Sequence, residues 1–104
     1  MIRSKIVGIG SYLPPRVLTN SDLEKMVDTS DAWITERTGI KSRHIAADNE
    51  YTSDLAVRAA LKALEDAGMT AKDLDMIILA TTTPDETLPA TATKVQKALE
   101  MTHG

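Results

Sequence analysis

The clearest pattern of hydrophobic and polar positions lies between Thr52 and Ala67. Charged residues recur there along one stripe of a 3.6-residue period, and the other positions are mainly apolar and small. The pattern predicts an amphipathic helix that is buried on most sides. It ends at Gly68, because glycine commonly follows the last helical turn. The charged stripe indicates the solvent-facing side of the helix and does not suggest a functional site.

Two further segments have the composition of strands. Lys5–Leu13 opens with a β-branched run. Asp75–Thr81 is continuously apolar rather than alternating, which is typical of a strand that is covered on both faces. A strand, a helix and a second strand in this order favour a βαβ crossover, so the predicted class is α/β.

Gly8 and Gly10 lie inside the first predicted strand and allow two interpretations. One is a dinucleotide-binding loop, but Leu13 stands where that motif needs a third small residue, and prolines replace the helix that should follow. The other is close packing of the backbone or a bulge in the strand. The sequence favours the second interpretation.

Capping residues predict a short helix after residue 19. Ser21 and Glu24 have the spacing of a capping box, and Asn20 is an alternative cap. Farther along, residues 40–47 weakly predict a strand or an extended arm. His44 within it is either a structural hydrogen-bonding residue or a functional one.

The only tryptophan, Trp33, lies in a second predicted helix that begins at a cap, Thr29 or Ser30, and ends at Gly39. Arg37 follows Trp33 by four residues, so the two side chains share one helix face. An aromatic plane beside a guanidinium suits a flat anionic ligand such as a nucleotide. The alternative is that Trp33 belongs to the core and Arg37 is a solvated surface charge.

The loop 81–89 follows the second predicted strand, at the end where open α/β sheets place ligands. Pro89 predicts a helix start, since proline is favoured at the first helical position. The apolar face of that helix is formed by Leu88, Ala92, Val95 and Leu99.

Composition narrows the classes of function. The 104 residues carry a net charge of −3, which disfavours nucleic-acid or membrane binding through bulk charge. No cysteine is present, which excludes a disulfide, a thiolate metal site and a cysteine nucleophile within these residues, and the two histidines form no metal-ligand pattern. The length of the chain predicts one small domain, residues 1–104. It has no apolar run of membrane-spanning length and no signal-peptide pattern, so the predicted compartment is the cytoplasm.

Several blocks of sequence together resemble β-ketoacyl-acyl-carrier-protein synthase III, the initiating condensing enzyme of bacterial fatty-acid synthesis. The blocks are Gly8–Pro14, Thr19–Glu24, Asp28–Ile40, Arg43–Ala46, Ala80–Asp85 and Leu88–Ala92. They cover essentially the whole chain, and residues 29–40 are the most specific part. The resemblance implies the N-terminal part of a thiolase-like fold, with a mixed sheet and packed helices, in a longer protein.

The implied reaction transfers a short acyl group from coenzyme A to an enzyme thiol and then condenses it with malonyl-acyl-carrier protein. Coenzyme A thioester is a substrate here, and no cofactor is implied. The family uses a Cys-His-Asn triad, whose matching positions lie beyond Gly104. Neither His44 nor His103 matches it, so no catalytic residue is assigned in this chain.

The resemblance does assign binding residues. The residue that matches Trp33 stacks on the adenine of coenzyme A, the one that matches Arg37 helps to hold the nucleotide, and the one that matches Thr29 lies at the same mouth. The position of Leu88, often phenylalanine in the family, lies on a loop at the dimer interface near the acyl pocket. The alternative is that Leu88 packs beneath its own loop.

The implied partners are acyl-CoA, acyl-carrier protein in the full-length enzyme, and either a second subunit in a homodimer or a complementing C-terminal half. Two other functions remain open. One is a quinolone- or polyketide-type starter enzyme of the same superfamily. The other is a non-catalytic half-domain that binds coenzyme A or a protein partner.

Overall fold

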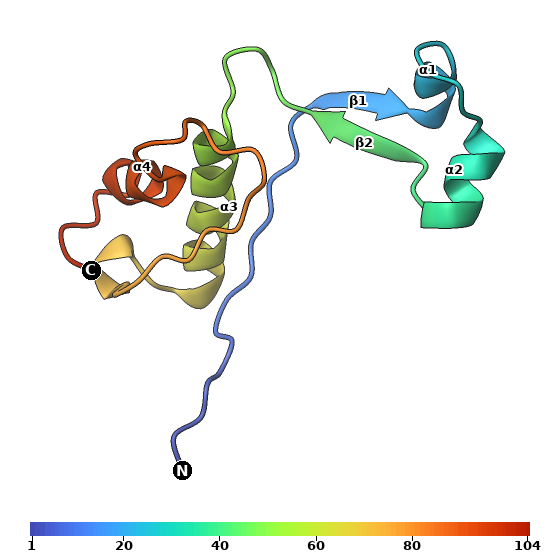
Figure 1. Ribbon diagram of the computed structural model, residues 1–104. Helices are drawn as coiled ribbons and strands as arrows, with labels where there is room; N and C mark the ends of the chain where they lie inside the picture. Colours follow the sequence, from blue (N-terminus) through green and yellow to red (C-terminus); the bar gives the residue numbers. More distant parts are fainter. The chain divides into compact units, whose positions relative to one another are not determined.

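The computed structural model describes all residues from Met1 to Gly104, which form two compact units. One unit comprises residues 13–49, and the other comprises residues 1–12 together with 50–104. The elements in chain order are β1 (Arg16–Thr19), α1 (Asn20–Glu24), α2 (Asp31–Thr38), β2 (Ser42–Ile45), α3 (Thr52–Ala67), the short 3-10 helix η1 (Ala71–Asp73) and α4 (Thr91–Ala98) (Figure 1). No helix has the length and apolar character needed to cross a membrane.

The smaller unit is built on an antiparallel ribbon of β1 and β2, in which Thr19 pairs with Ser42. Helices α1 and α2 lie together at that end of the ribbon (Figure 1). The expected strand within 40–47 is confirmed as β2. The end of the ribbon at Thr19 and Ser42 therefore supports both short helices.

Helix α1 begins at a different cap from the one expected. The Thr19 hydroxyl accepts a hydrogen bond from the Asp22 amide (3.1 Å), and the Asp22 carboxylate accepts one from the Thr19 amide (2.9 Å). The capping box is therefore Thr19 with Asp22, and the prediction from Ser21 and Glu24, with Asn20 as alternative, was wrong. Both pairs, Thr19 with Asp22 and Ser21 with Glu24, have the spacing of a capping box. The helix starts at the first pair because β1 ends at Thr19, where the extended backbone stops.

Helix α2 begins and ends as the sequence predicted. Ser30 is the cap, because its hydroxyl accepts a hydrogen bond from the Trp33 amide (3.1 Å). At the other end Gly39 adopts a left-handed conformation with φ of 70°, which glycine tolerates without a steric penalty.

In the larger unit α3 has the predicted bounds and ends at Gly68. The expectation that it is buried on most sides was wrong, because Leu64 is its only buried residue and Leu61 is 53% exposed. Helix α4 packs against it, and the core of this unit is completed by Val95 in α4 and by Leu99 and Met101 just after it. The apolar arc of α3 is therefore wider than the surface that this chain covers.

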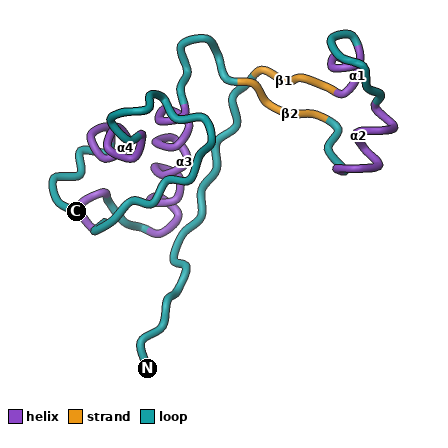
Figure 2. The backbone as a smooth tube through the Cα atoms, viewed as in Figure 1, coloured by secondary structure: helices purple, strands orange, loops and turns teal.

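The two expected strands of this unit do not form. Lys5–Leu13 and Asp75–Thr81 run as irregular segments, in the teal of loops in Figure 2, and make no backbone ladder. The βαβ crossover and the larger mixed sheet are therefore absent, and the sheet has only two strands. Side-chain composition favours extended backbone, but a strand also needs a partner whose amides and carbonyls complete the ladder.

Residues 75–81 were expected to be buried on both sides, but successive side chains alternate between half-buried and exposed. Ile77 and Leu79 are half-buried, whereas Met76 and Ile78 are 74% and 87% exposed. One side of this segment is therefore covered within the chain, and its other apolar side is not.

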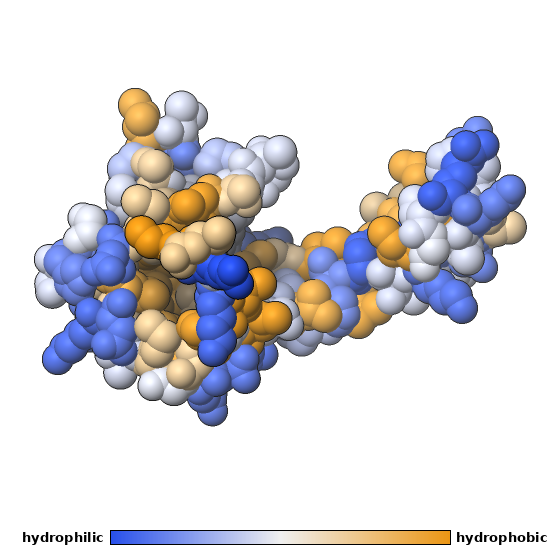
Figure 3. Space-filling view, turned by 90° about the horizontal axis from the view of Figure 1, so that it is seen from below, coloured by the Kyte–Doolittle hydropathy of each residue, from blue (hydrophilic) through white to orange (hydrophobic).

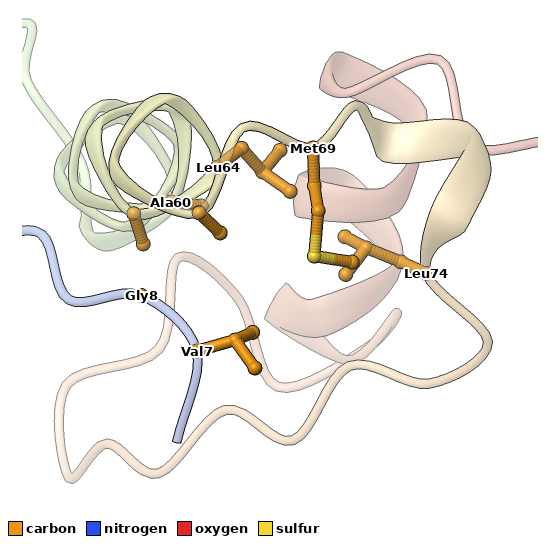
Figure 4. Close-up of a pocket in the computed structure, with 8 residues that line it drawn as sticks. Val7, Gly8, Ala60, Leu64, Met69 and Leu74 are labelled. Carbon is orange, nitrogen blue, oxygen red and sulfur yellow. The ribbon is translucent and has the colours of Figure 1, made fainter. Parts of the chain in front are cut away.

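The glycines of the N-terminal segment lie against α3. A Cβ atom on Gly10 would lie 2.5 Å from the carbonyl oxygen of Ala59, and one on Gly8 would lie 2.5 Å from that of Ala63. The interpretation as close backbone packing is therefore confirmed. Beside Gly8, an apolar cavity of about 210 Å³ is lined by Val7 and by residues of α3 and of the segment after it (Figure 4).

Candidate functional site

Helix α2 presents Trp33 to solvent. The indole is 52% exposed, and the buried residue of this helix is Ile34, on the next position along the chain. The alternative that Trp33 is a core residue was therefore wrong. A large aromatic side chain held outward on a capped helix provides a stacking surface.

Arg37 lies over that surface. Its Cζ atom is 4.7 Å from the centre of the Trp33 ring, which confirms that the two side chains share a helix face. This distance is within the range of a cation–π contact. A guanidinium carries a fork of N–H donors that an anionic group can accept from.

A hollow of about 300 Å³ opens beside the indole, at the start of α2. Its lining consists of Trp33, Thr29, Asp28 and the cap Ser30. The structure therefore brings Thr29 and Trp33 together at one hollow, with Arg37 against the indole. Asp28 was not among the expected site residues. An isolated aspartate before a helix has the signature of a cap, which hides such a role.

The hollow combines an aromatic plane, hydroxyl groups and charges of both signs. Thr29 and Ser30 supply hydroxyl oxygens, Asp28 supplies a carboxylate, and the Arg37 guanidinium adds a positive charge next to the ring. This set can stack a flat heterocycle and hydrogen-bond its polar edge. These are the interactions by which a protein binds such a ligand.

Leu88 lies in the larger unit, on the loop between residues 81 and 89. Its side chain is 81% exposed, so the alternative that it packs beneath its own loop was wrong. Helix α4 starts at Thr91, with Ala90 as cap, and the predicted start at Pro89 was wrong. The Thr91 hydroxyl accepts a hydrogen bond from the Asp85 amide (3.1 Å), which ties the loop to the helix start.

Asp85 fastens this loop to α3. One carboxylate oxygen accepts a hydrogen bond from the Ser53 amide (2.9 Å), in the first turn of α3, and the other accepts one from the Ser53 hydroxyl (2.5 Å). Mainly the hydroxyl bond, and then the amide bond and the charge of Lys94, hold the pKa of Asp85 below its usual value against the opposing effect of desolvation. The loop that carries Leu88 is thus anchored at α3 and α4.

Neither histidine has the surroundings of a catalytic base. His44 Nδ1 lies 2.5 Å from the carbonyl oxygen of Pro14, as in a structural hydrogen bond. His103 lies at the chain end, with Nε2 3.6 Å from a carboxylate oxygen of the exposed Asp75. No cluster of three or more histidine or acidic side chains is placed to hold a metal ion.

Several curated proteins that are closely similar to the chain have the same name. No family model matches the chain. Over 103 residues, 99% of its length, the chain is 65% identical to β-ketoacyl-[acyl-carrier-protein] synthase III of Rhodospirillum centenum. The chain is a relative of β-ketoacyl-[acyl-carrier-protein] synthase III. It spans about a third (32%) of the length of that relative.

Solved structures give the same relationship. The crystal structure of the synthase III from Aquifex aeolicus is 54% identical, with a TM-score of 0.87 over 94% of this chain and 32% of that one. The priming β-ketosynthase of the R1128 polyketide pathway is 32% identical, with a TM-score of 0.86 over 94% of this chain and 29% of that one. The chain therefore has the α/β fold of about a third of a thiolase-like synthase III.

Proposed function

We propose that this chain is part of an acyltransferase that condenses a short acyl-CoA primer with malonyl-acyl-carrier protein, the first condensation of fatty-acid synthesis. The observation that carries the proposal is the 65% identity to a synthase III over 99% of the chain. We also propose that the enzyme acts in the cytoplasm, where acyl-CoA and acyl-carrier protein meet.

In this enzyme α2 binds the nucleotide end of coenzyme A. The adenine stacks on the exposed indole of Trp33, and Arg37 and Thr29 hold the polar parts around it. The proposal is supported by the hollow at Thr29 and by the guanidinium 4.7 Å from the indole centre. Stacking of a base on an aromatic side chain is worth about 1–3 kcal/mol.

The bond-making groups of the proposed enzyme lie outside these 104 residues. Acyl transfer needs a thiolate, and the condensation needs donors that stabilise the enolate and the oxyanion. This sequence contains no cysteine. The role of the chain is therefore to hold the substrate handle and to support the fold, and by itself it is inactive.

A chimaera tests the function. In it, this chain replaces the matching 103 residues of the Rhodospirillum centenum synthase III. We expect condensation of acetyl-CoA with malonyl-acyl-carrier protein at a rate within about tenfold of the parent, since most positions are shared. A folded but inactive chimaera would contradict the proposed function.

Trp33→Ala in the chimaera tests the binding residues. We expect the Kd for coenzyme A, measured by calorimetry, to rise about tenfold, which is the loss of one base-stacking contact. Met26→Ala is the control, because Met26 is a 68% exposed apolar side chain of the same unit outside the hollow. An unchanged Kd in Trp33→Ala would remove Trp33 from the nucleotide site.

Leu88 contributes to the choice of primer in this proposal, as part of a loop at the dimer interface near the acyl pocket. Its 81% exposure on an anchored loop supports a role in contact with another surface. Leu88→Phe in the chimaera adds aromatic bulk, and we expect the ratio of kcat/KM for acetyl-CoA over branched acyl-CoA to change severalfold. Identical ratios would contradict this role.

A second candidate function is a half-domain that acts with a separate C-terminal half, as a binding module without catalysis of its own. The uncovered apolar side of residues 75–81 favours a protein partner for such a module. A polyketide-type starter enzyme is less favoured, since identity falls to 32% for the R1128 synthase. Calorimetry of the separate chain with coenzyme A distinguishes the module, because the module retains binding when the chimaera is inactive.

A further inference from the structure

Asn20 is the most deeply buried side chain of the chain, with 1% of its surface exposed. Its Nδ2 donates hydrogen bonds to Asp31 Oδ1 and to the carbonyl oxygen of Ile40, both at 2.9 Å, and lies 3.4 Å from Thr35 Oγ1. Its Oδ1 accepts a hydrogen bond from Arg43 Nη2 at 2.8 Å. Both donor hydrogens and the acceptor of the amide are therefore used inside the protein.

These partners place Asn20 at both ends of α2. Asp31 is the first residue of that helix, and Ile40 follows its C-terminal cap. On the other side, Arg43 belongs to β2 and also donates to the carbonyl oxygen of Leu18 in β1 (3.2 Å). One amide thus joins the start of α2, the residue after its end and the ribbon that supports it.

Few other contacts fix the position of α2. Ile34 is the single buried residue of the helix, so apolar burial gives it one anchor point. A second polar contact comes from Glu24, whose carboxylate accepts a hydrogen bond from the Asp31 amide at 2.6 Å. The orientation of the helix therefore depends mainly on polar contacts with α1 and the ribbon. Such bonds are directional and specify one geometry.

We propose that Asn20 is a positioning residue for nucleotide binding, which acts by holding α2 so that Trp33 and Arg37 meet coenzyme A. The proposal rests on the proposed function, because the ligand is the one assigned to the hollow beside Trp33. Trp33 and Arg37 lie between Asp31 and Ile40, the two points at which Asn20 holds this part of the chain. A small rotation of α2 would displace the indole and the guanidinium together, and displacements near 1 Å are costly for a preorganised site.

Two uncharged substitutions in the chimaera test the role without adding charge near an anionic ligand. Asn20→Ala removes all the side-chain bonds, and we expect the Kd for coenzyme A to rise about tenfold, with unchanged KM for malonyl-acyl-carrier protein. Asn20→Ser keeps one hydroxyl that can donate to Asp31 or Ile40, and an increase between those of wild type and Asn20→Ala is expected. Should the alanine variant not fold, the serine variant provides the measurement.

His44→Ala is the matched control. It removes a hydrogen bond to Pro14 in the same unit, and His44 pairs with Val17, away from the Thr19–Ser42 end of the ribbon. We expect a lower unfolding temperature and an unchanged Kd for coenzyme A. If Asn20 were merely structural, its variants would behave in the same way, and that result would overturn the proposal.

The outcome with Trp33→Ala separates this proposal from the proposed function. If Trp33→Ala weakens coenzyme A binding and both Asn20 variants leave it unchanged, the positioning role alone is wrong. If Trp33→Ala also leaves binding unchanged, the nucleotide site itself is wrong.

Discussion

At the scale of single residues, Asp85 acts as a helix cap from a distance. Its carboxylate receives the amide and hydroxyl of Ser53, although 32 positions separate the two residues, and its side chain is 6% exposed. The cap residue next to α3 in the chain, Tyr51, makes no side-chain capping bond of its own. A loop residue therefore accepts a first-turn amide of α3, in addition to the local bond from the Tyr51 amide to the Asp54 carboxylate (2.8 Å).

Asp85→Ala should lower the stability of the chimaera at neutral pH by about 1 kcal/mol, the usual value of a helix cap. The folded state lowers the pKa of Asp85, so its charged form stabilises the fold above its usual pKa. This contribution is lost as the pH falls through the lower, folded value. We expect the difference in unfolding temperature between wild type and variant to be largest at pH 6–7 and to shrink below about pH 4.

Thermal unfolding followed by circular dichroism between pH 3 and pH 7 measures this difference. Thr82→Ala is the control, since Thr82 is an exposed residue of the same loop. A difference that does not vary with pH would show that the Asp85 charge contributes nothing.

At the scale of elements, the N-terminal segment packs closely on α3 because its glycines have no side chain at the contact. Gly8 and Gly10 meet the helix where alanines predominate, and a Cβ atom on either glycine would lie 2.5 Å from a carbonyl oxygen of the helix. Polar contacts complete the fit, since the Ile9 amide donates to the carboxylate of Asp66 (3.0 Å). The two glycines therefore allow the short distance between the N-terminal segment and α3.

Gly10→Ala should destabilise the chimaera by about 1–3 kcal/mol, because the new methyl group meets helix backbone that cannot rotate away. The unfolding temperature of the chimaera, measured by calorimetry, reports the loss. Ser11→Ala, at an exposed position of the same segment, is expected to change it little. Equal effects of the two substitutions would mean that the segment does not pack closely on α3.

At the scale of the whole molecule, apolar surface remains uncovered. In the larger unit Ile6, Ile9, Met76 and Ile78 are each more than 70% exposed. Figure 3 shows hydrophobic residues gathered on the surface of this unit, on the left of the view. Exposed apolar patches of this kind mark contact with another protein surface or a risk of aggregation.

Ile78→Lys should act in opposite directions in two settings. In the separate chain it should reduce binding of a hydrophobic dye and self-association, because it adds charge to an exposed apolar side. In the chimaera we expect the rest of the enzyme to cover this side, so that lysine costs several kcal/mol as an unpaired buried charge. Ile78→Met, an apolar change of similar volume, is expected to leave both unchanged. A chimaera that tolerates lysine would contradict burial of this side.

The sequence by itself determined the features that depend on neighbours along the chain. The bounds of α3, the glycine stops at Gly39 and Gly68, and the shared face of Trp33 and Arg37 all follow from spacings of a few residues. The sequence also limited the cap of α2 to Thr29 or Ser30, and the structure selected Ser30. The synthase III relationship is also carried by these local blocks.

Tertiary structure alone decided what depends on distant partners. Residues 5–13 and 75–81 have the composition of strands, yet no ladder forms because no backbone in this chain pairs with them. Asn20 has the sequence signature of a cap, and only the folded unit shows it joining α2 to the ribbon. A hydrogen bond or a ladder requires two groups at a fixed distance and angle. When those groups are far apart along the chain, only folding brings them together.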